Sequence, residues 1–245
     1  MKSIDTVQQL TSEHILDPDT GAVSPRYYWK RNKVPTVEIK GKLPNKLSGL
    51  TLIKKDLVNA LNWIRTAKSL TNSSYQGCGG YFEPDDREVY NQIKALFVAS
   101  LTFYGKCFTE ANGRGAQASK SWLNEEYTEL HEYYMNFRHN FAAHSGDEKV
   151  ELARTFVLLH PKKKSEILPY LTTVRQQPDL VLPTEGDKGL EELIEYVITL
   201  VDEKYEKLSF KIIDDLILSE GVAYWRQKSK KGAPVVLGYP QKKRN

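Results

Sequence analysis

The chain has 245 residues, of which 40% are hydrophobic, 27% charged and 11% aromatic. This composition excludes an intrinsically disordered chain and predicts one globular domain with appendages. The formal net charge of +4 is compatible with a polyanionic partner without requiring one, because much of the excess comes from a lysine-rich C-terminus.

Neither a membrane protein nor a disulfide framework is expected. No apolar run approaches the length of a bilayer span, and the N-terminal stretch lacks the apolar core of a signal peptide. The two cysteines, Cys78 and Cys107, have no metal-binding spacing and allow one disulfide at most. We therefore expect a cytoplasmic protein with reduced thiols.

Residues 1–53 contain the turn-forming stretches DPDTGAVSP and KLPNKLSG around a short candidate strand, PTVEIKG. These signals predict an irregular N-terminal arm. From Lys54 onward, apolar residues recur every three or four positions, which predicts an amphipathic helix as far as about Leu70.

A second helix is expected to begin near Asp85, which has the spacing of a capping box with Glu88. Its apolar face consists of Val89, Ile93, Leu96, Phe97, Leu101 and Tyr104. The glycine-rich segment 109–120 follows. It lacks the Gly-Lys-Ser/Thr ending of a phosphate-binding loop, so we interpret it as a flexible connection.

A third helix is predicted with Ser121 as its cap and with Glu125 and Glu126 in its first turn, where negative charge is favourable. Its apolar residues follow steps of three and four, as in a helix that packs against another helix. They are Leu123, Tyr127, Leu130, Tyr134, Phe137 and Phe141. The next step reaches His144, and Gly146 predicts the end of the helix.

Apolar and β-branched segments on both sides of the sequence KKKS predict a β-hairpin at about residues 150–177. A last long helix is expected from about Asp187 to Ser219, with Gly221 at its end, and residues 222–245 are interpreted as a mobile basic tail. The sequence thus predicts a mainly α fold: an antiparallel helical bundle in residues 54–221 with a small β-hairpin appendage.

The third helix carries the candidate site. Arg138 and His144 are six residues apart, which places them about 120° apart around an ideal helix and roughly 9 Å apart along it. Asn140 and His144 form an i, i+4 pair, so the amide can fix the imidazole tautomer. We expect Arg138 and His144 to converge with a second copy of this helix across a two-fold axis. Two arginines and two histidines in one cleft would attract an anion such as a phosphodiester.

The stretch FRHNFAAHSG resembles the motif of the HEPN superfamily, in which an arginine, a polar residue and, a few positions later, a histidine lie near the end of a helix. It is most similar to the branch found in bacterial abortive-infection and related anti-phage proteins. The resemblance covers roughly residues 54–220. It implies a metal-independent endoribonuclease, usually a homodimer, in which Arg138 and His144 match the motif and His139 is the polar position. Asn140 is added from helix geometry alone.

Such an enzyme needs no cofactor, because RNA carries its own nucleophile in the 2′-hydroxyl. Cleavage would leave a 2′,3′-cyclic phosphate and a 5′-hydroxyl. His144 is the candidate general acid or base, since an imidazole pKa near 6.5 allows both forms at neutral pH. Arg138 is the candidate clamp for the phosphate oxygens. No metal is expected, because His139 and His144 lie about 140° apart around the helix and do not share a face.

Two alternatives remain open. A histidine near a helix C-terminus commonly just complements the helix dipole, and an arginine beside it is commonly solvated or ion-paired. The chain would then be a non-catalytic helical module that binds a nucleotide, RNA or a partner protein. In the second alternative, the chain is a toxin that a paired nucleotidyltransferase antitoxin modifies. A ribonuclease assay with a chelator tests the first alternative, and a neighbouring nucleotidyltransferase gene would favour the second.

Overall fold

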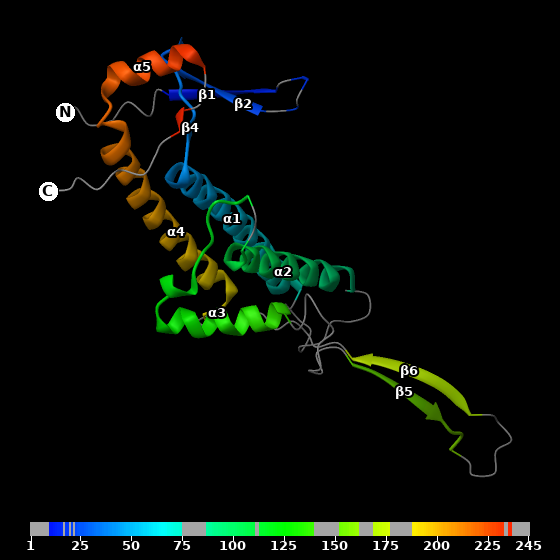
Figure 1. The fold of residues 1–245 in the computed structure, drawn as a ribbon. Helices are drawn as coiled ribbons and strands as arrows, with labels where there is room; N and C mark the ends of the chain where they lie inside the picture. The colour runs from blue at the N-terminus through cyan, green and yellow to red at the C-terminus, as the bar shows by residue number, and fades with distance from the viewer. Residues whose placement is uncertain are drawn as a thin grey trace. The chain divides into compact units, whose positions relative to one another are not determined.

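The computed structural model describes residues 10–16, 18–19, 21, 23–74, 87–110, 113–139, 152–161, 169–176, 188–232 and 235–236. In this part of the chain the fold is mainly helical, with five α-helices and small sheets, which confirms the predicted class (Figure 1). The helices are α1 (Lys42–Ser74), α2 (Arg87–Phe108), α3 (Glu125–Phe137), α4 (Leu190–Ile212) and α5 (Gly221–Lys231). A 3-10 turn at Lys120–Trp122 precedes α3, and a π-helical turn at Ile213–Ile217 follows α4.

The strands form three separate small sheets in the described residues. Strands β1, β2 and β3 make an antiparallel sheet, β4 pairs in parallel with β7, and β5 pairs antiparallel with β6. Their bounds are β1 Leu10–Leu16, β2 Val23–Trp29, β3 Asn32–Lys33, β4 Ile39–Lys40, β5 Leu152–Leu158, β6 Tyr170–Gln176 and β7 Val235–Val236. The β5–β6 pair, with Leu158 opposite Tyr170, confirms the predicted hairpin.

The chain forms two compact units. One combines Met1–Ser48 with Glu206–Asn245, and the other comprises Gly49–Tyr205. The second unit contains the helix that carries Arg138, so the candidate site belongs to it. None of the described helices is both long and apolar enough to span a membrane.

The N-terminal region differs from the irregular arm that the sequence predicts. Its described part contains four strands, and α1 begins at Lys42, well before the expected start at Lys54. The stretch KLPNKLSG, which suggests a break, is the first part of α1. Pro44 is tolerated there because a backbone N–H in the first helical turn has no partner in the helix, while Asn45 N–H donates to the Gly41 carbonyl at 2.9 Å.

In the second unit α1 packs against α2. The Ser100 hydroxyl of α2 donates to the Ala60 carbonyl of α1 at 2.8 Å, and the rings of Trp63 and Phe103 meet edge to face at 4.7 Å. The buried apolar side chains follow the predicted helical spacing. They are Ile53, Leu57, Ala60, Ile64 and Ala67 on α1 and Ile93, Phe97, Leu101 and Tyr104 on α2.

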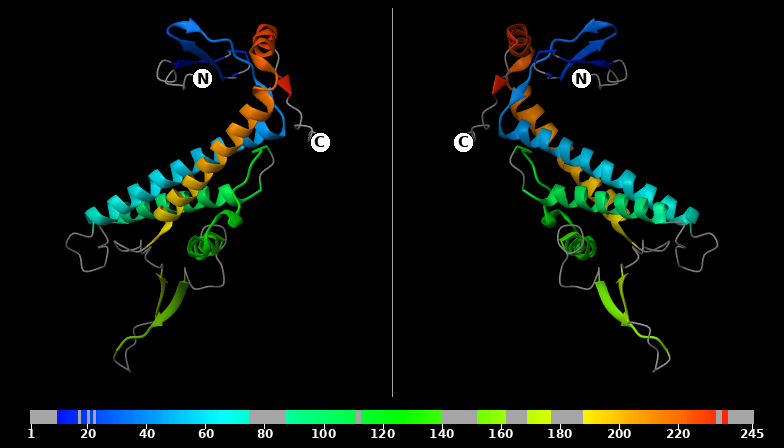
Figure 2. Two further views of the ribbon diagram at one scale, coloured as in Figure 1. Left: turned by 90° about the vertical axis from the view of Figure 1, so that its left-hand side faces the viewer. Right: turned by 90° about the vertical axis from the view of Figure 1, so that its right-hand side faces the viewer.

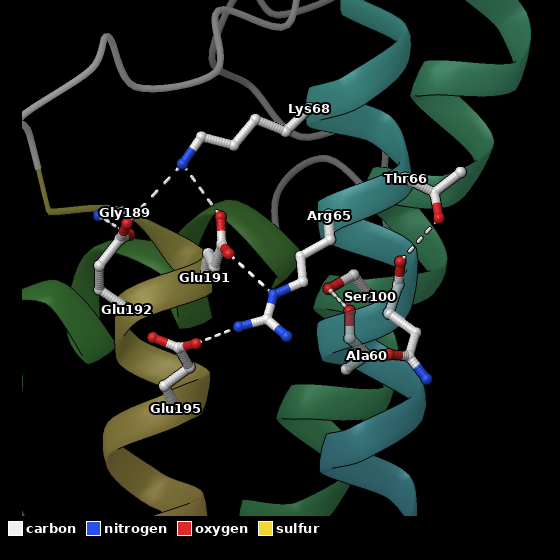
Figure 3. Close-up of polar contacts among 10 residues, drawn as sticks. Ala60, Arg65, Thr66, Lys68, Ser100, Gly189, Glu191, Glu192 and Glu195 are labelled. Atoms are coloured by element: carbon white, nitrogen blue, oxygen red, sulfur yellow. Dashed lines mark hydrogen bonds and ion pairs between the residues drawn. The ribbon is translucent and has the colours of Figure 1, made fainter.

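Helix α4 lies along α1 and is joined to it by ion pairs. Arg65 Nε donates to Glu191 at 2.9 Å, Lys68 donates to the same carboxylate at 3.0 Å, and Arg65 also pairs with Glu195 (Figure 3). Further along, Lys54 pairs with Asp202 at 2.7 Å. Contacts at rising numbers on α1 fall at decreasing numbers on α4, so the two helices run in opposite directions.

Helix α3 contacts both α2 and α4. Phe137 meets Phe97 of α2 edge to face at 5.7 Å, and Tyr127 stacks on Tyr196 of α4 at 4.0 Å. In Figure 2, α3 is seen nearly end-on while α1 and α2 extend across the view, so α3 crosses these helices.

The C-terminal region also differs from the predicted mobile tail, because residues 221–231 form α5 and Val235–Val236 form β7.

Candidate functional site

Two of the four predicted site residues lie in the described part of the chain. Arg138 and His139 continue α3 as a π-helical turn, with the Arg138 backbone N–H donating to the carbonyls of Met135 and Tyr134. His139 is exposed. Asn140 and His144 lie outside the described residues, so the predicted pairing of Arg138 with His144 stays a prediction.

Helix α3 begins later than the sequence suggests. Its cap is Asn124, whose side-chain oxygen accepts a hydrogen bond from the Tyr127 N–H at 2.9 Å, whereas Ser121 lies in the preceding 3-10 turn. Asn is as good a cap as Ser, and Glu125 and Glu126 remain in the first turn of the helix. One face of α3 meets α2, where His131 lies against Tyr104.

That face carries His131, Tyr134 and Arg138, which follow one another at steps of three and four. His131 and Tyr134 are buried, and Arg138 is partly exposed. Among the described residues, the Arg138 side chain has no hydrogen-bond or ion-pair partner.

Gly105 of α2 makes room for the Arg138 side chain. A Cβ atom at position 105 would lie 2.7 Å from Arg138 Nε and 3.2 Å from its Cζ, closer than van der Waals contact allows. Any larger residue would push the arginine away. The missing side chain at position 105 thus lets the arginine lie directly against the α2 backbone.

One helical turn earlier, His131 is fixed from α2. Its Nδ1 lies 2.7 Å from the Tyr104 hydroxyl, and its ring packs on Phe108 at 4.4 Å. Burial raises the pKa of Tyr104, so its hydroxyl stays protonated and can donate to Nδ1. Burial and the Lys120 ammonium lower the pKa of His131 below its usual value, although Glu132 opposes this effect. These effects favour the neutral form of the His131 imidazole.

Tyr104, Gly105 and His131 have no role in the site that the sequence predicts. The sequence contains a signal for His131, which lies four residues after Tyr127 and three before Tyr134 and so shares their helix face. Gly105 has no such signal, because only the crossing of α3 over α2 shows why a glycine is needed there.

A second polar cluster surrounds Asp56 of α1, which is 1% exposed. Arg114 Nη2 donates to its Oδ2 at 2.5 Å, Lys106 Nζ lies 3.1 Å from Oδ2, and Lys55 Nζ lies 3.1 Å from Oδ1. Burial alone would raise the pKa of Asp56, but the contacts with Lys55 and Lys106 outweigh this and lower it. The carboxylate is charged.

This cluster corrects the flexible connection predicted for residues 109–120. Arg114 also donates from Nη1 to the Lys106 carbonyl at 3.0 Å, and the Ala118 N–H donates to the Cys107 carbonyl at 2.9 Å. A Cβ at Gly49 of α1 would lie 2.5 Å from the Ala116 backbone nitrogen, so the segment approaches α1 closely. The glycines allow the backbone of this segment to turn, and the Arg114 hydrogen bonds to Asp56 and the Lys106 carbonyl hold the segment in place.

The described residues offer neither a metal site nor a thiol nucleophile. No group of three or more His, Cys, Asp or Glu side chains gathers there in a way that could hold a metal ion. Burial raises the pKa of the Cys107 thiol to about 12, although Arg114 lowers it somewhat, so the thiol is not ionised at neutral pH. This cysteine is a packing residue of the core.

No protein-family model matches the chain, and no curated protein or solved structure matches it significantly.

Proposed function

We propose that the chain is a metal-independent endoribonuclease of the HEPN type, of the kind that serves as a toxin or in defence against phage. One observation carries the proposal: Arg138, the arginine of the Arg-x5-His motif, crosses Gly105 and has no acidic partner among the described residues. A guanidinium that no described carboxylate neutralises suits an anionic substrate. Its planar fork of donors fits the oxygens of a phosphodiester.

In this mechanism the 2′-hydroxyl of RNA attacks the adjacent phosphorus. Arg138 binds the non-bridging oxygens, on which charge accumulates in the transition state. His144 removes the proton from the 2′-hydroxyl or returns one to the 5′-oxygen that leaves. His139 and Asn140 complete the site, with Asn140 orienting the imidazole. The products are a 2′,3′-cyclic phosphate and a 5′-hydroxyl.

The fold proposed with this activity is a HEPN-like bundle of α1 to α4 that dimerises. The opposite directions of α1 and α4, fixed by the Arg65 and Lys54 ion pairs, support it. So does the position of Arg138 at the end of a capped helix. A homodimer would bring two copies of the motif into one cleft and supply a general acid as well as a general base.

The proposal is tested by incubating purified protein with RNA and excess EDTA. We expect cleavage that leaves 5′-hydroxyl ends, which polynucleotide kinase labels without prior phosphatase treatment. Arg138→Ala should lower the rate about 10²- to 10³-fold, and His144→Ala about 10²- to 10⁴-fold. Arg226→Ala, which removes an exposed arginine from α5, is the matched control and should cleave like the parent protein.

The proposal would be wrong if Arg138→Ala and His144→Ala both cleaved RNA at the rate of the parent protein. If instead the wild-type protein bound RNA but did not cleave it, and Arg138→Ala weakened that binding, the non-catalytic binding module would be the better description. Loss of cleavage in EDTA alone would point to a metal enzyme.

A further inference from the structure

The cluster around Asp56 holds more positive charge than its structural task requires. Lys55, Lys106 and Arg114 lie within ion-pair distance of this single carboxylate, which leaves a net charge of +2 from three cations and one anion. One cation balances the charge of a buried carboxylate, and further cations around it repel one another. The two surplus charges therefore call for a second explanation.

Arg114 is the most buried of the three cations that surround Asp56. Its side chain is 8% exposed, and it joins Asp56 Oδ2 to the Lys106 carbonyl through two hydrogen bonds of 2.5 Å and 3.0 Å. It balances the charge of the carboxylate and secures the segment after α2. The two lysines add further stabilisation, since their contacts lower the pKa of Asp56.

The two lysines differ from Arg114 because they face solvent. The Lys55 side chain is 60% exposed and that of Lys106 is 48% exposed. Lys55 Nζ lies 3.1 Å from Asp56 Oδ1 and Lys106 Nζ lies 3.1 Å from Oδ2, so each contact with the carboxylate can use one of the three N–H groups of an ammonium. Asp56 thus collects two ammonium groups at the surface without using all their donors.

We propose that Lys55 and Lys106 form a phosphate-binding subsite for an RNA strand. The two ammonium groups contact opposite oxygens of one carboxylate, so they are no further apart than the carboxylate and two 3.1 Å contacts allow. A phosphate between them would relieve their repulsion, and its oxygens would accept their unused N–H groups. Lys106 also lies 5.0 Å above the Phe103 ring, which limits its side-chain freedom.

Helix α2 carries both Lys106 and Gly105, the residue over which the Arg138 side chain lies. Neighbouring residues of a helix point about 100° apart, so a strand would have to pass around α2 to meet both Arg138 and Lys106. The reacting phosphate would lie at Arg138, and another phosphate of the same strand at Lys106 and Lys55. The identity of the ligand as RNA rests on the proposed function, whereas the charge surplus does not.

The experiment measures binding apart from cleavage. A 2′-O-methyl oligoribonucleotide has no free 2′-hydroxyl and cannot be cleaved by transesterification, and its fluorescence anisotropy reports affinity at several salt concentrations. For two lost contacts to single-stranded RNA, Lys55→Gln with Lys106→Gln should reduce the salt slope by about 1.4 and the affinity at 0.1 M salt roughly 10- to 30-fold. Lys55→Arg with Lys106→Arg should restore both.

The matched control removes two exposed lysines elsewhere, Lys33→Gln with Lys46→Gln, and should leave affinity near that of the parent. The subsite is ruled out if the cluster variant binds like this control, or if the wild-type protein does not bind the oligonucleotide. Cleavage of unmodified RNA by wild-type protein is scored separately. Binding that depends on the two lysines without any cleavage would reject the nuclease and keep the subsite.

Discussion

His131 is a histidine whose role shows only in the structure. It belongs to the same stretch as the motif histidines, yet it is 6% exposed and its Nδ1 lies 2.7 Å from the hydroxyl of Tyr104. A buried histidine of this kind serves the packing of α3 on α2. Because its pKa is lowered in the folded state, its protonation opposes folding.

The sign of the resulting pH dependence is fixed. The unfolded chain takes up a proton at His131 near pH 6.5, its ordinary value, before the folded chain does. The contribution of His131 to stability is therefore complete above that pH and is lost as the pH falls below it. We expect the urea midpoint of unfolding to fall between pH 7.5 and pH 5 and expect His131→Gln to weaken this dependence. Equal pH slopes for parent and variant would contradict the role of His131.

At the residue scale, the sequence points to residues with charged or reactive side chains. It does not point to residues that matter only for packing. Arg138 is recognisable from its motif, and the structure places it at the end of α3. Gly105, which lets that arginine lie across α2, carries no chemistry of its own. Asp56 also gives no signal, since one carboxylate in an amphipathic helix is ordinarily taken for a solvated residue.

At the element scale, two glycines make close contacts of different kinds. The atoms that crowd Gly105 belong to the long, flexible side chain of Arg138, whereas those that crowd Gly49 include the Arg114 carbonyl and the Ala116 nitrogen. A side chain can move aside at little cost, but a backbone segment cannot. The two positions should therefore respond differently to the same substitution.

For Gly105→Ala we expect the free energy of unfolding to change by no more than about 1 kcal/mol, because alanine favours the helix while Arg138 is displaced. RNA cleavage should fall nearly as far as in Arg138→Ala. For Gly49→Ala we expect a loss of roughly 1–3 kcal/mol of stability, as in other overpacked sites. Chemical unfolding and the EDTA cleavage assay measure both quantities. Full activity in Gly105→Ala would show that the position of Arg138 over α2 does not matter.

Helices were predictable in this chain because periodic apolar faces are a local signal. Most of the face expected on α2 is buried, with Ile93, Phe97, Leu101 and Tyr104 in the core. Helix ends were less predictable: Pro44 reads as a breaker but is accommodated in the first turn of α1, and Asn124 takes the capping role expected of Ser121. Proline breaks the interior of a helix but is tolerated in its first turn, and Ser and Asn are about equally good caps, so residue type alone does not fix either helix start.

At the scale of the whole molecule, the division into units could not be read from the sequence. Strand β4 pairs with β7, so Ile39 lies opposite Val235 although nearly the whole chain separates them. Each strand has only two residues, which is too short for an alternating pattern to be visible. The first unit thus combines both ends of the chain, where the sequence suggests an arm and a tail.

The proposed nuclease mechanism also requires a particular oligomeric state. If one cleft requires Arg138 and His144 from two copies of the chain, then a monomer is inactive, and activity follows the fraction of dimer. Specific activity should be constant at high protein concentration and fall on dilution. The fall should occur over the range in which mass measurements show conversion of dimer into the 28.1 kDa monomer. On dilution, the specific activity of Arg226→Ala should fall over the same concentration range as that of the parent protein, since α5 carries no motif residue. Undiminished specific activity in a solution that contains only monomer would show that one chain forms the complete site.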